Sequence, residues 1–560
     1  MTFTYTQQHY DPANLTLSIN KFEAGSEATS QTFTLESSLN WTLDSSDESF
    51  CTVSPIRGKA GAHTITLFVT ANTSTDRGRT ATLTARSGYE TATIKVTQER
   101  KKPELNIDRG IKTLDDLCRF RDAVNAGESL SEWKYNGEIN LLSDIDLSYF
   151  DEWQGIGSSK HPFTETFNGN GFSIKNMKIT TSNNSFWNTR YGFFWMCEGG
   201  IIKNLVLENA NSNGYGICGS CTSSGNYPAK IINCTVSGYV QYAPFGFCSQ
   251  GDYSEQSVYI TDCTNKSLTN IPICFYGGNG DGIVVSSCAN EGIYCDSRYD
   301  DFTDDGYKVG YELFQVLAEA NVYSTEDFVN YVNFSLENLS IEMDSQEISV
   351  NDKFLELASN SQSIKELYIS NDNYYGGISQ MNQFTEIIDM FTNITRLECS
   401  IHNSYGSNIS GILYNTKPRL ETLIIRNNNN THSLFLSASP DETFPALKRL
   451  EVFGCKYPMI YMTSTCKELV VQNSWLEKLT VDGAQLEYID VHGCQDLINL
   501  DVSKTNLINS TYEYPLNCQN CGSEKQPMTL SLKTGWEING INKNINYHYI
   551  DSWTIIDYVD

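Results

Sequence analysis

The stretch that decides the fold spans residues 466–503 and reads CKELVVQNSWLEKLTVDGAQLEYIDVHGCQDLINLDVS. Four apolar anchors, Leu469, Leu479, Ile489 and Leu500, recur in it every 10 or 11 positions. This period is half the length of one solenoid coil, so alternate anchors should stack. We expect Leu469 above Ile489 on one wall, and Leu479 above Leu500 on the opposite wall. Because no single coil can bury its apolar face alone, one coil implies its neighbours.

Upstream segments repeat the same template at wider spacing. They read IKELYIS from Ile364, ITRLECS from Ile394, LETLIIR from Leu420 and LKRLEVF from Leu447. The residue eight places after the first apolar one is Asn428, Cys455 or Cys494 in three of the coils, and we expect these residues inside the ladder. The pattern resembles leucine-rich repeats. That resemblance implies a solenoid over residues 307–515, followed by a β-rich C-terminal cap over 516–560.

Three short helices should precede these coils and cap the stack. The segments are YELFQVLAEA, the EDFVNYVN segment entered through Ser324, and NDKFLELASN. An acidic connector, DSRYDDFTDDGYKVG, comes before them. Its aspartates could suggest calcium, but their spacing does not fit a calcium-binding EF-hand loop, and a solvated linker is preferred.

Residues 104–295 carry a second repeat. A helix should begin at Thr113, with Asp116 completing its cap, and end at Gly127. Further on, the units GFFWM, GICGS, GFCSQ and ICFYG each precede a second strand. Two cysteine series recur with them, and both should point inward and pack as thiols: Cys234, Cys263 and Cys288, and Cys218, Cys248 and Cys274. These coils favour a right-handed parallel β-helix.

The ordered motifs VNAG, LLSDIDLS, WQGIG, FNGNGFSIKNMKI, YGFF and GGIIKNLVLEN resemble GLUG-type β-helix modules of bacterial adhesins and surface proteins. Catalytic β-helices also exist and need convergent carboxylates, or a base with Lys or Arg, on adjacent coils. The candidate acids form no convergent constellation in the sequence, and no HExxH motif occurs. They are Asp144, Asp146, Asp151, Glu152, Glu208, Asp262 and Asp281. Hydrogen bonding at turns and strand ends is the simpler role for Asp144 and Asp146.

Residues 11–101 alternate apolar and polar side chains with a period of two, as in QTFTLES and HTITLFVTA. Turn signals separate these runs, and an immunoglobulin-like sandwich is expected, with Trp41 in its core. The segments SSLNWTL, NTSTDRGRTATLTA and IKVTQ resemble a BACON domain, a domain family found N-terminal to other modules of exported Bacteroidetes proteins. The family name suggests carbohydrate binding. A spacer role is preferred, because Trp41 and Phe68 should lie in the core or at an edge.

Composition narrows the function classes. The net charge of −28 argues against a nucleic-acid ligand. The sequence contains no run of 18 apolar residues, the length needed to span a bilayer. The first residues resemble no signal peptide, so either the protein is cytosolic or its export signal and any lipid anchor lie upstream. The BACON resemblance favours export to the cell surface. The 17 cysteines form no small disulfide framework. The pairs Cys218/Cys221 and Cys518/Cys521 could form local bonds or bind metal, but no metal or other cofactor is expected.

Three modules, two of them solenoids, favour a binding surface over a catalytic pocket. The exposed face of the C-terminal sheet should carry ten candidate binding residues: Tyr368, Arg396, Glu398, Arg426, Arg449, Glu451, Phe453, Gln472, Tyr488 and His492. An ordinary solvated sheet would look similar. The leading hypothesis is an exported, non-enzymatic surface adhesin that recognises a protein or glycan. The alternative is a polysaccharide-active β-helix lyase or glycoside hydrolase.

Overall fold

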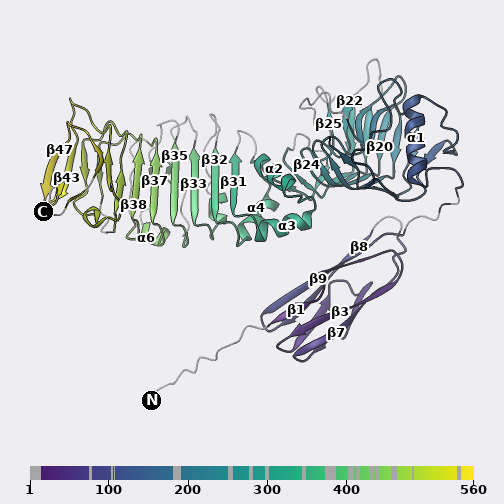
Figure 1. The fold of residues 1–560 in the computed structure, drawn as a ribbon, viewed down its shortest axis with the longest axis horizontal. Helices are drawn as coiled ribbons and strands as arrows, with labels where there is room; N and C mark the ends of the chain where they lie inside the picture. The colour runs from purple at the N-terminus through teal and green to yellow at the C-terminus, as the bar shows by residue number, and fades with distance from the viewer. Residues whose placement is uncertain are drawn as a thin grey trace. The chain divides into compact units, whose positions relative to one another are not determined.

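The computed structural model describes residues 14–74, 78–101, 105, 107–180, 191–249, 257–276, 282–296, 302–343, 348–371, 386–401, 409–410, 417–427, 434–435, 440–455, 463–481, 485–538, 544–545 and 547–560. The chain is mainly β and contains a β-solenoid (Figure 1). It divides into two compact units, one of Met1–Gly110 with Asn170–Phe172 and one of Ile111–Gly169 with Ser173–Asp560.

The first unit has two β-sheets. One has the order β1-β3-β7-β5 and is antiparallel, and the other has the order β2-β9-β8-β4-β6, in which β2 pairs with β9 in parallel. The strands are β1 (Leu15–Leu17), β2 (Lys21–Ala24), β3 (Thr29–Ser37), β4 (Trp41–Ser45), β5 (Cys51–Ser54), β6 (Arg57–Gly58), β7 (Gly61–Val69), β8 (Arg79–Ser87) and β9 (Glu90–Gln98).

The period-two alternation of this region is confirmed. Leu35, Ile65, Leu83 and Val96 are buried in one core with Trp41, which is 2% exposed. Phe68 is not in this core: it lies on the outer side of β7 and is 47% exposed.

The second unit begins with helix α1 (Leu114–Ala126), which has the expected ends. Thr113 and Asp116 form a capping box, and Gly127 ends the helix in the left-handed conformation at φ 72°. Leu117, Phe120 and Val124 pack inward. The helix therefore closes the first coil of the solenoid that follows.

Three sheets build that solenoid, and all pairings in them are parallel except β10 with β11. The first contains β10 (Lys134–Tyr135), β11 (Glu138–Asn140), β13 (Thr166–Asn168), β17 (Ile201–Lys203), β20 (Ala229–Ile232), β23 (Val258–Thr261) and β26 (Ile283–Ser286). The second contains β12 (Ile145–Asp146), β14 (Ser173–Lys175), β15 (Lys178–Ile179), β18 (Val206–Ser212), β21 (Thr235–Val240), β24 (Thr264–Thr269), β27 (Cys288–Asn290), β28 (Ile293–Tyr294), β29 (Phe302–Asp304) and β30 (Tyr307–Lys308). The third contains β16 (Phe194–Glu198), β19 (Cys218–Thr222), β22 (Phe247–Ser249) and β25 (Phe275–Tyr276).

One expected thiol ladder is confirmed. Cys234, Cys263 and Cys288 are all buried, and the residues that follow them pair in register from β21 through β24 to β27. Each thiol contacts a backbone carbonyl of the preceding coil, as Cys263 does with Ile231 at 3.6 Å. These cysteines act as small core residues.

The other expected ladder is wrong in its register. Cys221, not Cys218, pairs with Cys248, and Cys197 pairs with Cys221. Cys274 directly precedes Phe275, which pairs with Phe247. The spacing of Cys218, Cys248 and Cys274 misaligned the coils, because successive units differ in length and a recurring cysteine need not take the same place in each strand. The cysteines of both series are nevertheless buried and unbonded.

Three helices connect the β-helical coils to the next sheet. They are α2 (Tyr311–Glu319), α3 (Thr325–Phe334) and α4 (Asp352–Asn360). α2 and α4 lie within the segments expected to be helical, and α3 extends one residue beyond its expected segment at each end. The side chain of Ser324 accepts a hydrogen bond from the Asp327 amide, as its capping role requires. The helices lie between the two sets of strands (Figure 1), and one continuous core runs from Ile293 through Phe314 to Leu367.

The remaining coils stack into two main parallel sheets. The larger contains β31 (Asn338–Met343), β32 (Glu366–Asn371), β33 (Arg396–Ile401), β35 (Thr422–Asn427), β37 (Arg449–Phe453), β38 (Glu468–Gln472), β40 (Tyr488–Asp490), β42 (Leu516–Cys518) and β46 (Tyr547–Ile550). The smaller contains β39 (Lys478–Thr480), β41 (Asn499–Asp501), β43 (Thr529–Lys533) and β47 (Ile555–Val559). Short elements accompany them: β34 (Ile409–Ser410), β36 (Leu434–Phe435), α6 (Pro440–Thr443), η1 (Leu507–Asn509), β44 (Glu537–Ile538) and β45 (Asn544–Ile545).

The two-wall stacking of the anchors is confirmed. Leu469 pairs in register with Ile489 in the larger sheet, and Leu479 pairs with Leu500 in the smaller one. Coils continue after Ser503, because β42 and β46 extend the larger sheet and β43 and β47 the smaller. The segment expected as a separate cap is thus made of further coils.

Candidate binding surface

The ten candidate residues lie together on the outer face of the larger sheet, around β32–β40. The first row across the strands contains Arg396, Arg449 and Tyr488, the second Tyr368, Glu398 and Glu451, and the third Arg426, Phe453 and Gln472. His492 lies two residues beyond the end of β40, and its amide donates to the Asp490 carboxylate at 2.9 Å. The alternation read from the sequence is correct, since the residues between these positions form the buried ladder.

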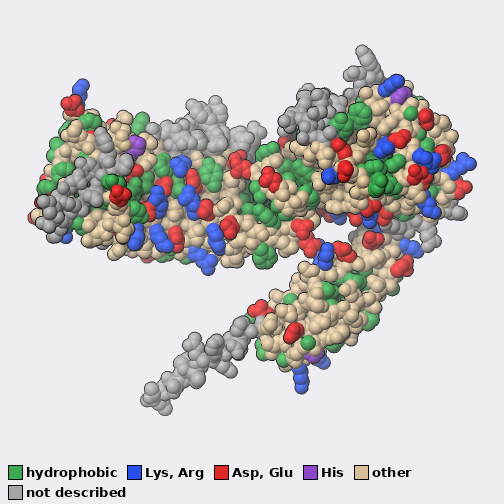
Figure 2. Space-filling model, in the orientation of Figure 1, with side chains coloured by type: hydrophobic (Ala, Val, Ile, Leu, Met, Phe, Trp, Pro, Cys, Tyr) green, Lys and Arg blue, Asp and Glu red, His purple; other side chains and the backbone are tan. Residues whose placement is uncertain are grey.

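Acidic and basic side chains alternate across this face (Figure 2). Arg396 contacts Glu366 at 3.7 Å and Glu398 at 3.1 Å. Glu398 also forms an ion pair with Arg426 at 2.7 Å, and the Arg426 guanidinium lies 4.3 Å above the ring centre of Phe453. Arg396 and Glu398 thus pair with each other on β33 and with one neighbouring strand each, while Arg426 contacts both of its neighbouring strands. These contacts orient the side chains that face solvent.

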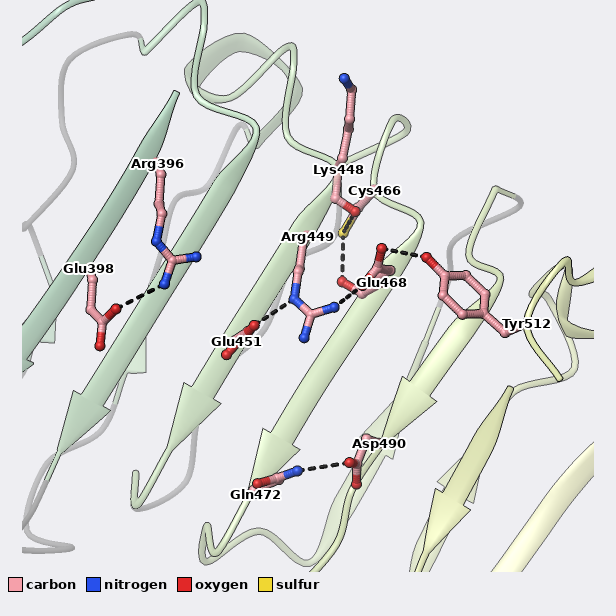
Figure 3. Close-up of polar contacts among 10 residues, drawn as sticks. All are labelled: Arg396, Glu398, Lys448, Arg449, Glu451, Cys466, Glu468, Gln472, Asp490 and Tyr512. Atoms are coloured by element: carbon pink, nitrogen blue, oxygen red, sulfur yellow. Dashed lines mark hydrogen bonds and ion pairs between the residues drawn. The ribbon is translucent and has the colours of Figure 1, made fainter. Parts of the chain in front are cut away.

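A second cluster is centred on Arg449 (Figure 3). Its guanidinium contacts Glu451 at 2.5 Å and also Glu468, which accepts the hydroxyl of Tyr512. Burial would lower the pKa of Arg449, yet the hydrogen bonds and charges of the two glutamates raise it. Burial, with the hydrogen bond to Glu468, raises the pKa of Tyr512 to about 12. Arg449 stays cationic and Tyr512 neutral at any physiological pH.

The middle of the face is less exposed than the sequence predicted. Glu451 is only 9% exposed, and Ile424 and Val470 in the same row are buried as well. Gln472 donates to Asp490 at 2.7 Å, and Asp490 is itself buried. The accessible groups of the face are therefore the arginines, with Arg449 37% and Arg426 39% exposed, and Tyr368 near the start of the sheet, which is 37% exposed.

A cleft of about 590 Å³ opens at that end, and we call it the α2 cleft. It is lined by α2, by the end of α3 and by β31–β33, and it includes Tyr368, Arg396 and Glu398. Its other lining residues are Glu312, Leu313, Val316, Tyr331, Ser335, Leu336, Glu337, Asn338, Leu339, Ser340, Glu366 and Leu367. This volume is in the range typical of ligand sites.

Sequence reasoning missed the helical side of the α2 cleft. Leu313, Phe314 and Leu317 form the buried stripe of α2, whereas Tyr311 and Val316 lie outside that stripe and are 63% and 44% exposed. Apolar residues off the stripe of an amphipathic helix were the available signal. Nothing local, however, indicates that α2 lies beside β31–β33.

The β-helical part contains one compact charged set. Lys175 lies 3.7 Å from Asp144 and 3.4 Å from Glu208 on adjacent coils. Asp144 also accepts the Ser173 amide, and Asp146 accepts the amides of Ser148 and Asn176. The hydrogen-bonding role expected of Asp144 and Asp146 is confirmed. Asp281 lies outside the described residues, as does Asn428 of the predicted ladder.

The remaining predicted thiol sites are apolar in character. Cys455, Cys494, Cys518 and Cys521 are buried, and burial raises the pKa of each thiol above its ordinary value. Within the described ranges, no group of three or more His, Cys, Asp or Glu side chains is arranged to hold a metal ion. Across the same residues, no helix has the length and apolar character needed to cross a membrane.

Comparisons with known proteins match parts of the chain. A family model named BACON, described as "Putative binding domain, N-terminal", matches residues 40–99. Halomucin of Haloquadratum walsbyi is 32% identical over 116 residues, which are 19% of this chain and 1% of that protein. The chain therefore spans only a small fraction of the curated relative it matches.

Two solved structures share limited similarity with the chain. A PapD-like domain of human CEP192 is 14% identical, with a TM-score of 0.14, and the match covers 19% of this chain and 99% of that one. A Bacteroides ovatus xyloglucanase solved with a heptasaccharide is 10% identical, with a TM-score of 0.16, covering 78% and 76%. At such TM-scores neither structure bears on the fold or the function of this protein.

Proposed function

We propose that this chain is an exported, non-enzymatic surface protein that binds a protein or a glycan through the outer face of its larger C-terminal sheet. The observation that carries the proposal is the alignment of Tyr368, Arg396, Glu398 and Arg426 on neighbouring strands, beside a cleft of ligand size. Aromatic and arginine side chains of this kind dominate protein interfaces. The ion pairs of Glu398 with Arg396 and Arg426 hold these three side chains in place before any ligand arrives, which lowers the entropic cost of binding.

The match of residues 40–99 to a family described as a binding domain supports the same class of function. In this account the N-terminal sheets form an immunoglobulin-like BACON module that spaces or assists the binding surface. The β-helical coils are of the GLUG type, and the C-terminal coils are leucine-rich repeats of a Bacteroidetes cell-surface protein.

A glycan array and an array of secreted and surface proteins test the proposal together. The double variant Tyr368→Ala/Arg426→Ala should lose the ligands that the wild-type chain retains. The matched control is Tyr149→Ala/Lys448→Ala, because Tyr149 is exposed on the β-helical coils and Lys448 forms an exposed ion pair with Glu421. If the first double variant keeps every interaction of the wild type, the proposed surface is wrong.

The enzymatic alternative has one specific location, the Asp144–Lys175–Glu208 set. Both carboxylates contact the same ammonium group, so they lie close enough together for acid–base chemistry. Their ion pairs, however, satisfy all three side chains in the way a stabilising surface cluster does. Incubation of the protein with a panel of polysaccharides distinguishes a catalytic role of this set from a stabilising one. Reducing ends or unsaturated products that disappear in Asp144→Asn would replace the binding proposal with a catalytic one.

A further inference from the structure

The α2 cleft carries an excess of negative charge. Its lining contains four glutamates, Glu312, Glu337, Glu366 and Glu398, and a single basic residue, Arg396. Arg396 is already paired with Glu366 and Glu398. Within the described part of the chain, Glu312 and Glu337 form no ion pair, and both are exposed. Two exposed carboxylates in the lining of the cleft are thus available to a cation.

Apolar and aromatic groups lie next to these carboxylates. Val316 is 44% exposed on the α2 side and Tyr368 is 37% exposed on the sheet, with Leu313 and Leu336 deeper in the lining. Figure 2 shows hydrophobic side chains gathered over α2 with acidic ones beside them. A tyrosine ring beside carboxylates suits an ammonium or guanidinium group, which the ring face attracts. The aliphatic stem of the same side chain would cover the exposed leucine and valine surface.

Charge complementarity therefore selects among the occupants. Nucleic acid and acidic glycans would meet unpaired carboxylates of their own sign. A neutral glycan could use Tyr368, but it would gain nothing from the excess charge of the cleft or from the net charge of −28. A basic peptide segment would be favoured by both charges, because the negative electrostatic field of the whole protein steers it to the surface and the carboxylates of the cleft bind it there.

We infer that the α2 cleft binds a basic, apolar-containing peptide segment of a partner protein, with a Lys or Arg side chain between Glu312, Glu337 and Tyr368 and an adjacent apolar side chain against Val316. The inference rests on the proposed binding function and assigns a protein ligand to one end of the sheet. A cationic segment that lies along the face of β31–β33 would also meet Glu366.

Fluorescence anisotropy with a labelled peptide of lysine and leucine separated by serine tests the inference on the full-length chain. Two partner peptides carry glutamate in place of lysine, or serine in place of leucine. The lysine–leucine peptide should bind, the other two should bind weakly or not at all, and the affinity should fall as salt rises. Equal binding of the peptide with serine in place of leucine would show general electrostatic attraction and overturn the inference.

Matched variants locate the site. Glu312→Gln/Glu337→Gln should weaken binding at least about fivefold, as the loss of two charge contacts implies. Glu524→Gln/Glu537→Gln removes the same charge from exposed positions in the C-terminal coils and should leave binding unchanged. Equal affinities of the two variants would contradict the assignment. If array ligands depend on Tyr368 and Arg426 while no peptide binds, the inference fails alone; if peptides bind at the cleft while array ligands ignore both residues, the proposed face fails.

Discussion

The substitution Ile489→Ala probes how neighbouring coils stabilise one another. Ile489 is fully buried and pairs in register with Leu469 on one side and Leu516 on the other. Its amide donates to the Pro515 carbonyl at 2.8 Å, a bond that alanine keeps. The change therefore removes side-chain packing alone. Three carbon atoms at about 0.8 kcal/mol each give about 2.4 kcal/mol, and the residual cavity brings the cost to about 3–4 kcal/mol.

Hydrogen exchange followed by mass spectrometry measures this cost locally, which matters because a multi-module chain does not unfold in one step. Peptides covering β38, β40 and β42 should exchange about 100- to 1,000-fold faster in Ile489→Ala, since 1.4 kcal/mol is tenfold. The control Ile555→Ala removes the same atoms from a side chain that is 50% exposed and should change exchange little. Equal effects of the two variants would refute the packing argument. An effect that extends to the β-helical strands would refute the assumption that coils couple mainly to their neighbours.

Three further outcomes follow from buried or paired groups. In the native protein a thiol reagent at pH 8 should label Cys118 first, because all other cysteines except Cys295 are buried. Cys295 should react slowly, because burial raises its pKa to about 12. Rapid labelling of several thiols would contradict the packed cysteine ladders. Asp389→Asn should lower the free energy of unfolding, measured by heat or denaturant, by about 3–5 kcal/mol, because the fully buried ammonium of Lys417, 3.3 Å away, loses its counter-charge. The double replacement Asp389→Leu/Lys417→Met should recover much of this loss. Burial would raise the pKa of Asp116, but hydrogen bonds at the α1 cap lower it. The stability that ionised Asp116 gives the protein should therefore be complete above about pH 4 and be lost as the pH falls further. The difference in melting temperature between Asp116→Asn and wild type should shrink at pH 3, and an unchanged difference would exclude this pH dependence.

Local patterns predicted a large part of the fold. The spacing of Leu469, Leu479, Ile489 and Leu500 was enough to assign two walls, because a buried ladder must recur at the coil length. Capping residues predicted both ends of α1 and the start of α3 for similar reasons, since orphan amides and carbonyls at a helix terminus need a partner close in sequence.

Other features depend on geometry that single-sequence periodicity does not carry. The pairing of Cys221 with Cys248 depends on the length of the turns between strands, which the recurrence of the cysteines does not report. The ten face residues were assigned correctly by alternation, yet the burial of Glu451 depends on side chains from neighbouring strands. The α2 cleft joins residues more than eighty positions apart, from Glu312 to Glu398, and only the packing of α2 beside the sheet brings them together.

A hydrogen-exchange footprint tests the central claim most directly. The wild-type chain would be measured with and without a ligand found on the arrays, at saturating concentration. The account predicts slower exchange in peptides covering α2 and β31–β35, with the β-helical strands around β20 unchanged. Protection confined to the β-helical coils or to the N-terminal sheets, with none on the face that carries Tyr368 and Arg426, would contradict it.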